Sequence, residues 1–245
     1  MKLINICYLI DHKFLDLTLK SIQYIETFFK SSKHELKFYI IGIDEFDVPD
    51  NITYIKSSYL SLPLLHQRVY IPKMLGVSRV IFLDSDTITT TCISKLWETD
   101  LKDNIIGAVT SSHVPTVRAS VAAWKFNFPP FTDQDILELP YFDAGMMLID
   151  CNKWIDSKIP EKTLKIFKTY AHTKYSGHDE PGFSTTLRDK WLKLDERWNY
   201  IPNSIKNRNR WKRSYIMQWA GGGCDKLLHD HFYTYRGNKN DSSSK

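Results

Sequence analysis

Two carboxylates, Asp84 and Asp86, directly follow a short apolar run from Val80 to Leu83. Residues two apart at a strand end project in the same direction, so their negative charges would lie side by side. Such a pair is unfavourable unless a cation neutralises it, and hard carboxylate oxygens prefer Mg²⁺ or Mn²⁺. A divalent ion there could hold a diphosphate and stabilise it as a leaving group. The alternative is a pair of solvated carboxylates in a turn.

The first 86 residues predict the elements that position this pair. Residues 15–30 have apolar side chains at helical spacing, and residues 62–76 form a second helix between Pro63 and Gly76. Apolar runs predict buried strands at Leu3 to Ile10, Leu36 to Ile43, Ile52 to Ile55 and Val80 to Leu83. This alternation predicts a mostly parallel α/β sheet, in which ligands bind beyond the carboxyl ends of the strands.

The second half of the chain is less regular. Apolar runs predict strands at Ile105 to Val109 and at Gly145 to Ile149, and a helix is expected over 159–171. Four prolines in 111–140 predict a loop-rich segment that lines a site. The glycine-rich 214–224 segment is either a lip for an acceptor or ordinary core and turn.

Composition narrows the class of protein. Of the 245 residues, 42% are hydrophobic and 25% are charged, which excludes a mainly disordered chain or a fibre. No apolar run approaches the ~20 residues that a transmembrane helix needs. Four separated cysteines without a CxxC pair favour a reducing compartment, and we expect a cytoplasmic protein.

The net charge is +5, and the densest basic cluster lies in residues 206–213. We expect no nucleic-acid partner, because such proteins usually concentrate basic charge on one element. The cluster is either a solvated loop or a surface for peripheral contact with a membrane or an anionic glycan.

A phosphatase of the haloacid dehalogenase type also places D-x-D after a buried strand, with the first aspartate as nucleophile. That class usually has Thr or Val two residues after the second aspartate, where this chain has Ile88. It also needs a further acidic pair, and nothing after residue 180 resembles one. The phosphatase therefore remains an alternative of lower rank.

Several segments in register resemble the family-eight glycosyltransferases. They are HQRVYIPKMLGVSRVIFLDSDTI, YFDAGMMLIDCNKW, GHDEPGFSTTL, LDERWNY and the opening INICYLIDHKFLDLTLKSI. The resemblance covers residues 4 to about 237. It implies a single GT-A domain over 1–237, with a Rossmann-like, mostly parallel sheet flanked by helices and a small second antiparallel sheet. Residues 238–245 would be a polar tail, or a linker within a longer polypeptide.

The same resemblance implies a divalent metal, Mn²⁺ or else Mg²⁺, bound by Asp84 and Asp86. The family's third ligand is a histidine near the C-terminus, and the matching stretch here is KLLHDHFYTYRGNK. His229 follows the apolar pair as the family histidine does, and His231 is the alternative. The family's diphosphate-binding lysine has no counterpart at its place, so Arg236 or Lys239 would substitute.

The resemblance also implies residues that bind a nucleotide-sugar donor, usually a UDP-sugar. Arg68 and Ser85 would contact the donor, and Tyr8, Leu9 and Asp11 would lie where the family holds the uracil. Tyr8 would stack on the base and Asp11 would accept its N3–H. The alternatives are a core tyrosine and an arginine in an ordinary ion pair.

Two carboxylates replace family amides near the expected donor sugar. Asp143, with Ala144 and Gly145, matches the family's N-A-G segment, and Asp179 and Glu180 match its D-Q pair. Asp179 would bind sugar hydroxyls. Glu180 would act as a nucleophile or stabilise an oxocarbenium-like centre, unless the pair only favours a helix dipole.

The resemblance therefore implies a metal-dependent retaining glycosyltransferase that moves a sugar from a UDP-sugar to a glycan or another hydroxyl acceptor. A nucleotide-sugar-binding protein without transferase activity is the second alternative, because the histidine motif departs from the family's pattern. The residues name neither the sugar nor the acceptor.

Overall fold

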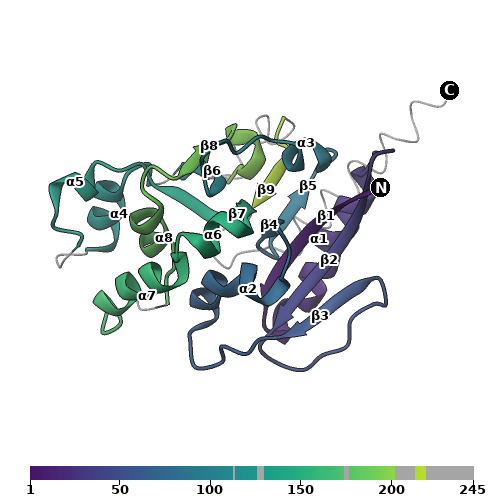
Figure 1. Ribbon diagram of the computed structural model, residues 1–245, viewed down its shortest axis with the longest axis horizontal. Coiled ribbons are helices and arrows are strands. Elements are labelled where there is room, and N and C mark those ends of the chain that lie inside the picture. The colour runs from purple at the N-terminus through teal and green to yellow at the C-terminus, as the bar shows by residue number, and fades with distance from the viewer. Residues whose placement is uncertain (113, 126–129, 174–176, 202–212, 219–245) are drawn as a thin grey trace.

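The computed structural model describes residues 1–112, 114–125, 130–173, 177–201 and 213–218. A seven-stranded sheet crosses the protein in the order β3-β2-β1-β4-β7-β6-β8 (Figure 1). Its strands are β1 (Lys2–Ile10), β2 (His34–Gly42), β3 (Ile52–Lys56), β4 (Arg79–Leu83), β6 (Ile106–Thr110), β7 (Phe142–Asp150) and β8 (Trp191–Lys193). A two-stranded sheet pairs β5 (Thr87–Thr89) with β9 (Ile216–Gln218).

The large sheet is mostly parallel. Strands β3, β2, β1 and β4 run parallel to one another, and β6 runs parallel to β8. Only β7 is antiparallel to both of its neighbours, and the small β5–β9 sheet is antiparallel. The predicted α/β class, the mostly parallel sheet and the small second sheet are confirmed.

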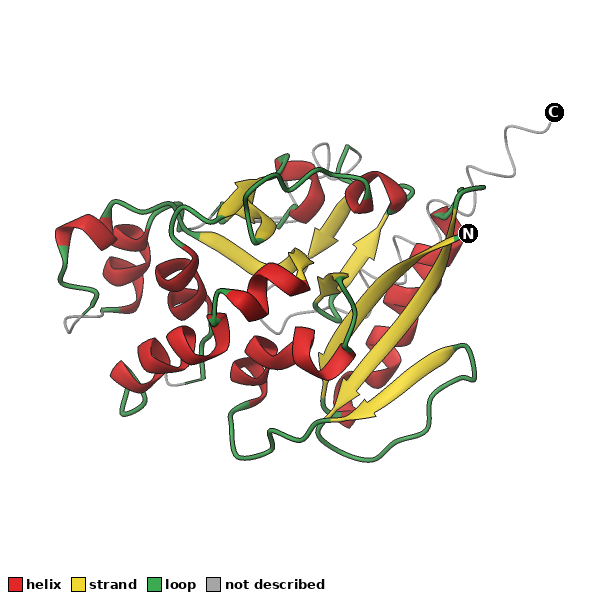
Figure 2. Ribbon diagram, viewed as in Figure 1, coloured by secondary structure: helices red, strands yellow, loops and turns green. Residues whose placement is uncertain are grey.

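Helices cover both faces of the large sheet (Figure 2). They are α1 (Leu15–Phe28), α2 (Ile71–Leu75), α3 (Ser94–Trp97), α4 (Val117–Trp124), α5 (Gln134–Leu137), α6 (Cys151–Asp156), α7 (Ile159–Thr169) and α8 (Glu180–Leu187), with short 3₁₀ turns η1 (His12–Phe14), η2 (Leu64–Tyr70) and η3 (Glu196–Asn199). The alternation of β1 explains the two layers. Ile6 and Tyr8 pack with α1, whereas Cys7 and Leu9 belong to the core that includes Trp154 of α6.

The helix expected over 62–76 forms as two pieces. Residues 64–70 are the 3₁₀ turn η2, and α2 begins at Ile71 with Pro72 in its first turn. Proline is accepted there because its missing N–H would have no helical partner, but it prevents one continuous α-helix. Gly76 ends α2 at φ +63°, which requires a glycine-like conformation.

The expectation of a loop-rich 111–140 segment is wrong in part, since α4 and α5 form within it. The Thr116 hydroxyl accepts the amide of Ala119, and the Asp133 carboxylate accepts the amide of Asp135, so each helix begins at a side-chain cap. The prolines lie outside both helices. The prolines therefore marked correctly where helices are interrupted, but the two short helices between them were not predicted.

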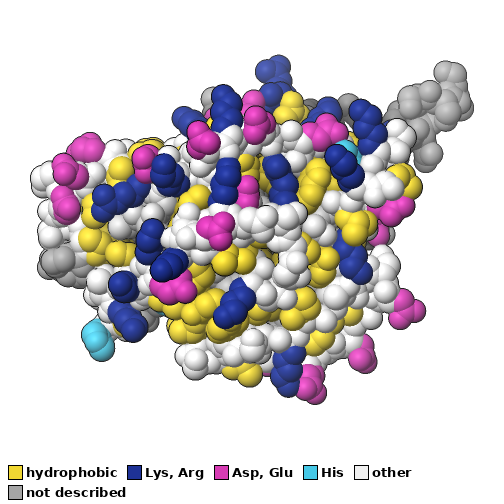
Figure 3. Space-filling view, viewed as in Figure 1, with side chains coloured by type: hydrophobic (Ala, Val, Ile, Leu, Met, Phe, Trp, Pro, Cys, Tyr) yellow, Lys and Arg dark blue, Asp and Glu magenta, His cyan; other side chains and the backbone are white. Residues whose placement is uncertain are grey.

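On the face shown in Figure 3, lysine and arginine side chains stand among acidic and apolar ones. Basic charge is spread over this face rather than gathered into one stripe. Within the described ranges, the protein contains no helix with the length and apolar character required to cross a membrane.

Candidate active site

The Asp84–Asp86 pair lies in the turn that follows β4. The Asp84 amide donates to the Gly145 carbonyl on β7 at 2.8 Å, and the Thr87 hydroxyl donates to the Asp84 carbonyl at 2.8 Å. The Thr18 hydroxyl of α1 donates to Ser85 at 2.8 Å. The turn is thus fixed from the sheet and from α1, which places both carboxylates at the carboxyl end of the strand, as predicted.

Arg68 joins two site residues that are far apart in the sequence. Its buried guanidinium donates through Nη2 to Asp84 Oδ1 and through Nη1 to Asp179 Oδ2, the latter at 2.9 Å. The guanidinium also lies over the Phe82 ring, 4.7 Å from its centroid. The 3₁₀ turn η2 therefore supplies the cation between β4 and α8.

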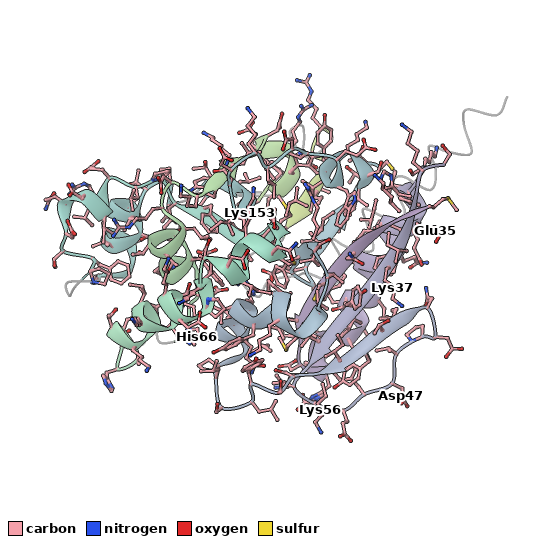
Figure 4. All side chains as sticks on the ribbon, in the orientation of Figure 1. Glu35, Lys37, Asp47, Lys56, His66 and Lys153 are labelled. Atoms are coloured by element: carbon pink, nitrogen blue, oxygen red, sulfur yellow. The ribbon has the colours of Figure 1, made fainter. Side chains whose placement is uncertain are left out.

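Asp179 and Glu180 begin α8, as the sequence predicted. Asp179 precedes the first helical residue, and its side chain is 4% exposed. Glu180 Oε2 accepts the Tyr141 hydroxyl at 3.2 Å. Behind the pair, the His66 ring stacks on Phe167 and its Nε2 lies 3.3 Å from the His178 carbonyl oxygen, which ties η2 to the residue before Asp179 (Figure 4).

The Asp143–Ala144–Gly145 segment lies inside β7 rather than before it. Asp143 Oδ1 accepts the Gly145 amide and the Asn199 side-chain amide, each at 2.8 Å. The Ala144 carbonyl faces Arg68 Nη1 at 3.5 Å. The structure therefore brings Asp143 into the same cluster as Asp84, Asp179 and Glu180.

Burial dominates the electrostatics of this cluster. It raises the pKa of Asp84 to about 6 against the opposing charge of Arg68, and it raises the pKa of Asp86 to about 8 with the help of the Asp84 charge. Burial and the neighbouring Asp143 raise the pKa of Glu180 well above its usual range. The cluster is a place where added positive charge is favourable.

The prediction that Tyr8 stacks on a base is wrong for this structure. Its side chain is fully buried against α1, and its hydroxyl is 2.9 Å from the Ser21 hydroxyl. Leu9 is also buried, in the opposite core. Asp11 accepts the Lys13 amide at 3.0 Å and caps η1. The aromatic ring exposed after β1 is Phe14, whose exposed fraction is 44%.

Sequence reasoning missed two residues at the site, Asn199 and Gln218. Gln218 Nε2 donates to Asp84 Oδ2 at 2.9 Å from β9, 134 residues away. Asn199 belongs to the LDERWNY segment and could have been singled out there, whereas no local signal marks Gln218.

The residues fit a divalent cation. Asp86 Oδ1 is buried and has no hydrogen-bond partner in the described part of the chain, and the donor set is hard oxygen. Among the residues that the structure describes, no group of three or more histidine, cysteine or acidic side chains has a geometry suited to metal binding. The remaining predicted ligands, His229 and His231, and the predicted diphosphate contact Arg236 lie outside the described residues.

Gly145 allows the close approach of Gln218, because a Cβ at this position would overlap the Gln218 amide. Gly145→Ala is expected to displace that amide from Asp84, to destabilise the protein by about 1–3 kcal/mol and to lower activity. Urea unfolding and initial rates would measure both effects. Gly177→Ala is the matched control, since its Cβ would meet no atom within 4 Å. Equal effects of the two variants would contradict this role of Gly145.

Comparisons with known proteins agree with the geometry. The chain is 26% identical to General stress protein A of Bacillus subtilis over 69% of this chain and 60% of that protein. It is 29% identical to Probable galacturonosyltransferase-like 7 of Arabidopsis thaliana over 81% of this chain and 58% of that protein. The chain thus spans about three fifths of the length of these relatives.

Among solved structures, the galactosyltransferase LgtC, in complex with donor and acceptor sugar analogues, superposes with a TM-score of 0.71 at 16% identity, over 96% of each chain. This likeness confirms the expected GT-A fold. The sequence model of the family described as Glycosyl transferase family 8 matches residues 6–218. Because this match covers most of the chain, the protein belongs to glycosyltransferase family 8.

Proposed function

We propose that this chain is a metal-dependent glycosyltransferase that moves a sugar, with retention, from a UDP-sugar to a glycan or another hydroxyl acceptor. The observation that carries the proposal is the partly buried carboxylate pair at the end of β4, of which Asp84 is joined through Arg68 to Asp179. Family membership supports the reaction class. The name of the Arabidopsis relative makes galacturonate one of the sugars to test.

Asp84 and Asp86 would hold the divalent ion, with Mn²⁺ favoured if a histidine completes the site. When bound, this ion supplies positive charge that stabilises a departing diphosphate. Gln218 and Arg68 fix the Asp84 carboxylate from two sides. Arg68 also holds Asp179 in place, where its second oxygen can accept a sugar hydroxyl.

Glu180 lies beside Asp143 and accepts a hydrogen bond from the Tyr141 hydroxyl. In the proposed reaction this carboxylate faces the positive charge that develops at the sugar ring, and preorganised charge of this kind is a main source of rate enhancement. The bond from the sugar to the diphosphate breaks, and the acceptor hydroxyl attacks from the side of the departing UDP, which takes the hydroxyl proton, so the configuration is retained.

Phe14 is the proposed platform for the base, because it is exposed in the 3₁₀ turn η1 that follows β1. Phe14→Ala is expected to weaken UDP binding by about 5- to 150-fold, since base–aromatic stacking is worth ~1–3 kcal/mol. Tyr8→Phe is expected to leave UDP affinity unchanged and to cost about 0.5–1.5 kcal/mol of stability through the lost Ser21 hydrogen bond. Calorimetric titration with UDP checks both. The reverse pattern would restore Tyr8 as the platform.

The proposed activity is tested by release of UDP from a panel of UDP-sugars, with Mn²⁺, with Mg²⁺ and with a chelator. Metal-dependent UDP release that an acceptor glycan accelerates is the expected result. Tight UDP binding without turnover on any donor would favour a nucleotide-sugar-binding protein. Phosphate release that beryllofluoride inhibits would favour the phosphatase.

A further inference from the structure

One side of the candidate active site consists of hydrogen-bond acceptors. Asp143 and Asp179 are 7% and 3% exposed, and Glu180 lies next to them at the start of α8. The donors that these three carboxylates receive come from within the protein: the Gly145, Ala144 and Asn199 amides, Arg68 and the Tyr141 hydroxyl. An ionised carboxylate can only accept hydrogen bonds, so the lone pairs of Asp179 that Arg68 leaves free call for donors from a ligand.

Two buried amide oxygens extend the same surface. Asn199 donates its amide nitrogen to Asp143, and Gln218 donates its amide nitrogen to Asp84. Asn199 is 5% exposed and Gln218 is 4% exposed, yet Asn199 Oδ1 and Gln218 Oε1 have no hydrogen-bond partner among the residues that the structure describes. Turning either amide over would lose its bond to the carboxylate. A buried acceptor without a donor is unfavourable, and a ligand that presents hydroxyl groups would satisfy it.

The charge balance points in the same direction. Among the described residues, the cluster contains five carboxylates, Asp84, Asp86, Asp143, Asp179 and Glu180. In that part of the chain, Arg68 is the one arginine or lysine that forms an ion pair with any of them. It forms one pair with Asp84 and one with Asp179. A divalent ion on Asp84 and Asp86 would still leave Asp143 and Glu180 without an ion pair in the described ranges, although the Arg68 charge acts on both.

We propose that the donor sugar is a neutral, hydroxyl-bearing sugar and that this acceptor-lined cluster discriminates against uronic-acid donors. A sugar hydroxyl can donate to Asp143, to Asp179 or to the Asn199 amide oxygen. An ionised sugar carboxylate can donate to none of them and would lie beside charges of its own sign, which is a repulsive device for specificity. The inference rests on the proposed function, because it concerns the sugar that a UDP donor would bring.

Two matched donor pairs test the inference. UDP-glucose and UDP-glucuronate differ only in the oxidation state of carbon 6, and so do UDP-galactose and UDP-galacturonate. Calorimetric titration of the Mn²⁺-loaded protein at pH 7.5, with UDP alone as the reference, gives a ratio of dissociation constants for each pair. We expect the dissociation constant of the uronate to exceed that of its neutral partner in both pairs. In at least one pair the difference should be about tenfold or more.

The Asp143→Asn variant tests whether the cluster causes the preference for neutral donors over uronic-acid donors. The substitution keeps an oxygen that can accept the Gly145 amide and removes one negative charge. The ratio of uronate to neutral affinity is expected to shift toward the uronate by about threefold or more. Because a ratio is measured, a general loss of affinity cancels. Glu35→Gln also removes one negative charge, but from an exposed position at the N-terminal end of β2 (Figure 4), and it should leave the ratio unchanged.

The failures are distinguishable. A uronate donor that binds as tightly as its neutral partner, while UDP binds with Mn²⁺, would overturn this inference and leave the proposed function intact. An unchanged ratio in Asp143→Asn would overturn the role given to the cluster. An absence of UDP binding in the presence of Mn²⁺ would overturn the proposed function and this inference together.

Discussion

Replacing Arg68 with methionine is expected to destabilise the protein by about 3–5 kcal/mol. The guanidinium is 6% exposed and pairs with Asp84 and with Asp179, which is 4% exposed, so its removal leaves two carboxylates without their cation. Methionine keeps an apolar stem against Phe82, which limits the loss of packing. Activity is expected to fall by on the order of 10²-fold or more, because Asp84 and Asp179 lose their common anchor.

Arg118→Met is the matched control for that experiment. Arg118 pairs with Glu138 on the surface, where both side chains are more than half exposed, and exposed pairs contribute about 0–1 kcal/mol. Urea unfolding of both variants measures the difference. Equal stability losses would show that the Arg68 network contributes no more than a surface ion pair.

Asp86→Asn is expected to reduce activity by on the order of 10²- to 10³-fold, because it removes one of the two proposed metal ligands. In the metal-free protein the same change is expected to increase stability at pH 8. Asp86 has a folded-state pKa of about 8, above the ordinary value of 3.8. Between these values the folded state retains a proton that the unfolded state has released, so stability falls as pH rises from about 4 to about 8. Asparagine removes this loss.

Thermal unfolding at pH 5 and pH 8, with and without Mn²⁺, measures the effect. The melting temperature of the metal-free wild type should be lower at pH 8 than that of Asp86→Asn, and Mn²⁺ should raise it in the wild type only. If Asp86→Asn were less stable than the wild type at pH 8 without metal, this result would contradict the raised pKa of Asp86 in the folded protein. Glu138→Gln, an exposed carboxyl change, serves as the control.

The sequence was sufficient to predict the parallel half of the sheet and the position of Asp84 and Asp86, because both follow from local apolar runs. The β7 strand was located but predicted to begin three residues too late, since Asp143 is a charged residue inside a buried strand. Polar residues in strands are normally read as boundaries. Here the Asn199 and Gly145 amides stabilise the carboxylate within the sheet.

Other features of the site depend on contacts between distant segments. Tyr8 and Phe14 are both aromatic and both lie near the end of β1, and only the packing of α1 shows that Tyr8 faces the core. Gln218 reaches Asp84 from a short strand whose partner, β5, begins one residue after Asp86. No periodicity in either segment signals that pairing. Arg68 likewise binds two residues that are distant from it in the sequence: Asp84 lies 16 positions after it and Asp179 lies 111 positions after it.

The most direct test of the metal-bridged donor site is the thermal stability of the protein with UDP, GDP, CDP and dTDP, each with and without Mn²⁺. Ligands that bind only the folded state raise its melting temperature. A rise with UDP that requires Mn²⁺ and disappears in Asp84→Asn is the predicted result. A melting temperature that no nucleotide changes, or a UDP response that persists in Asp84→Asn, would contradict the proposed site.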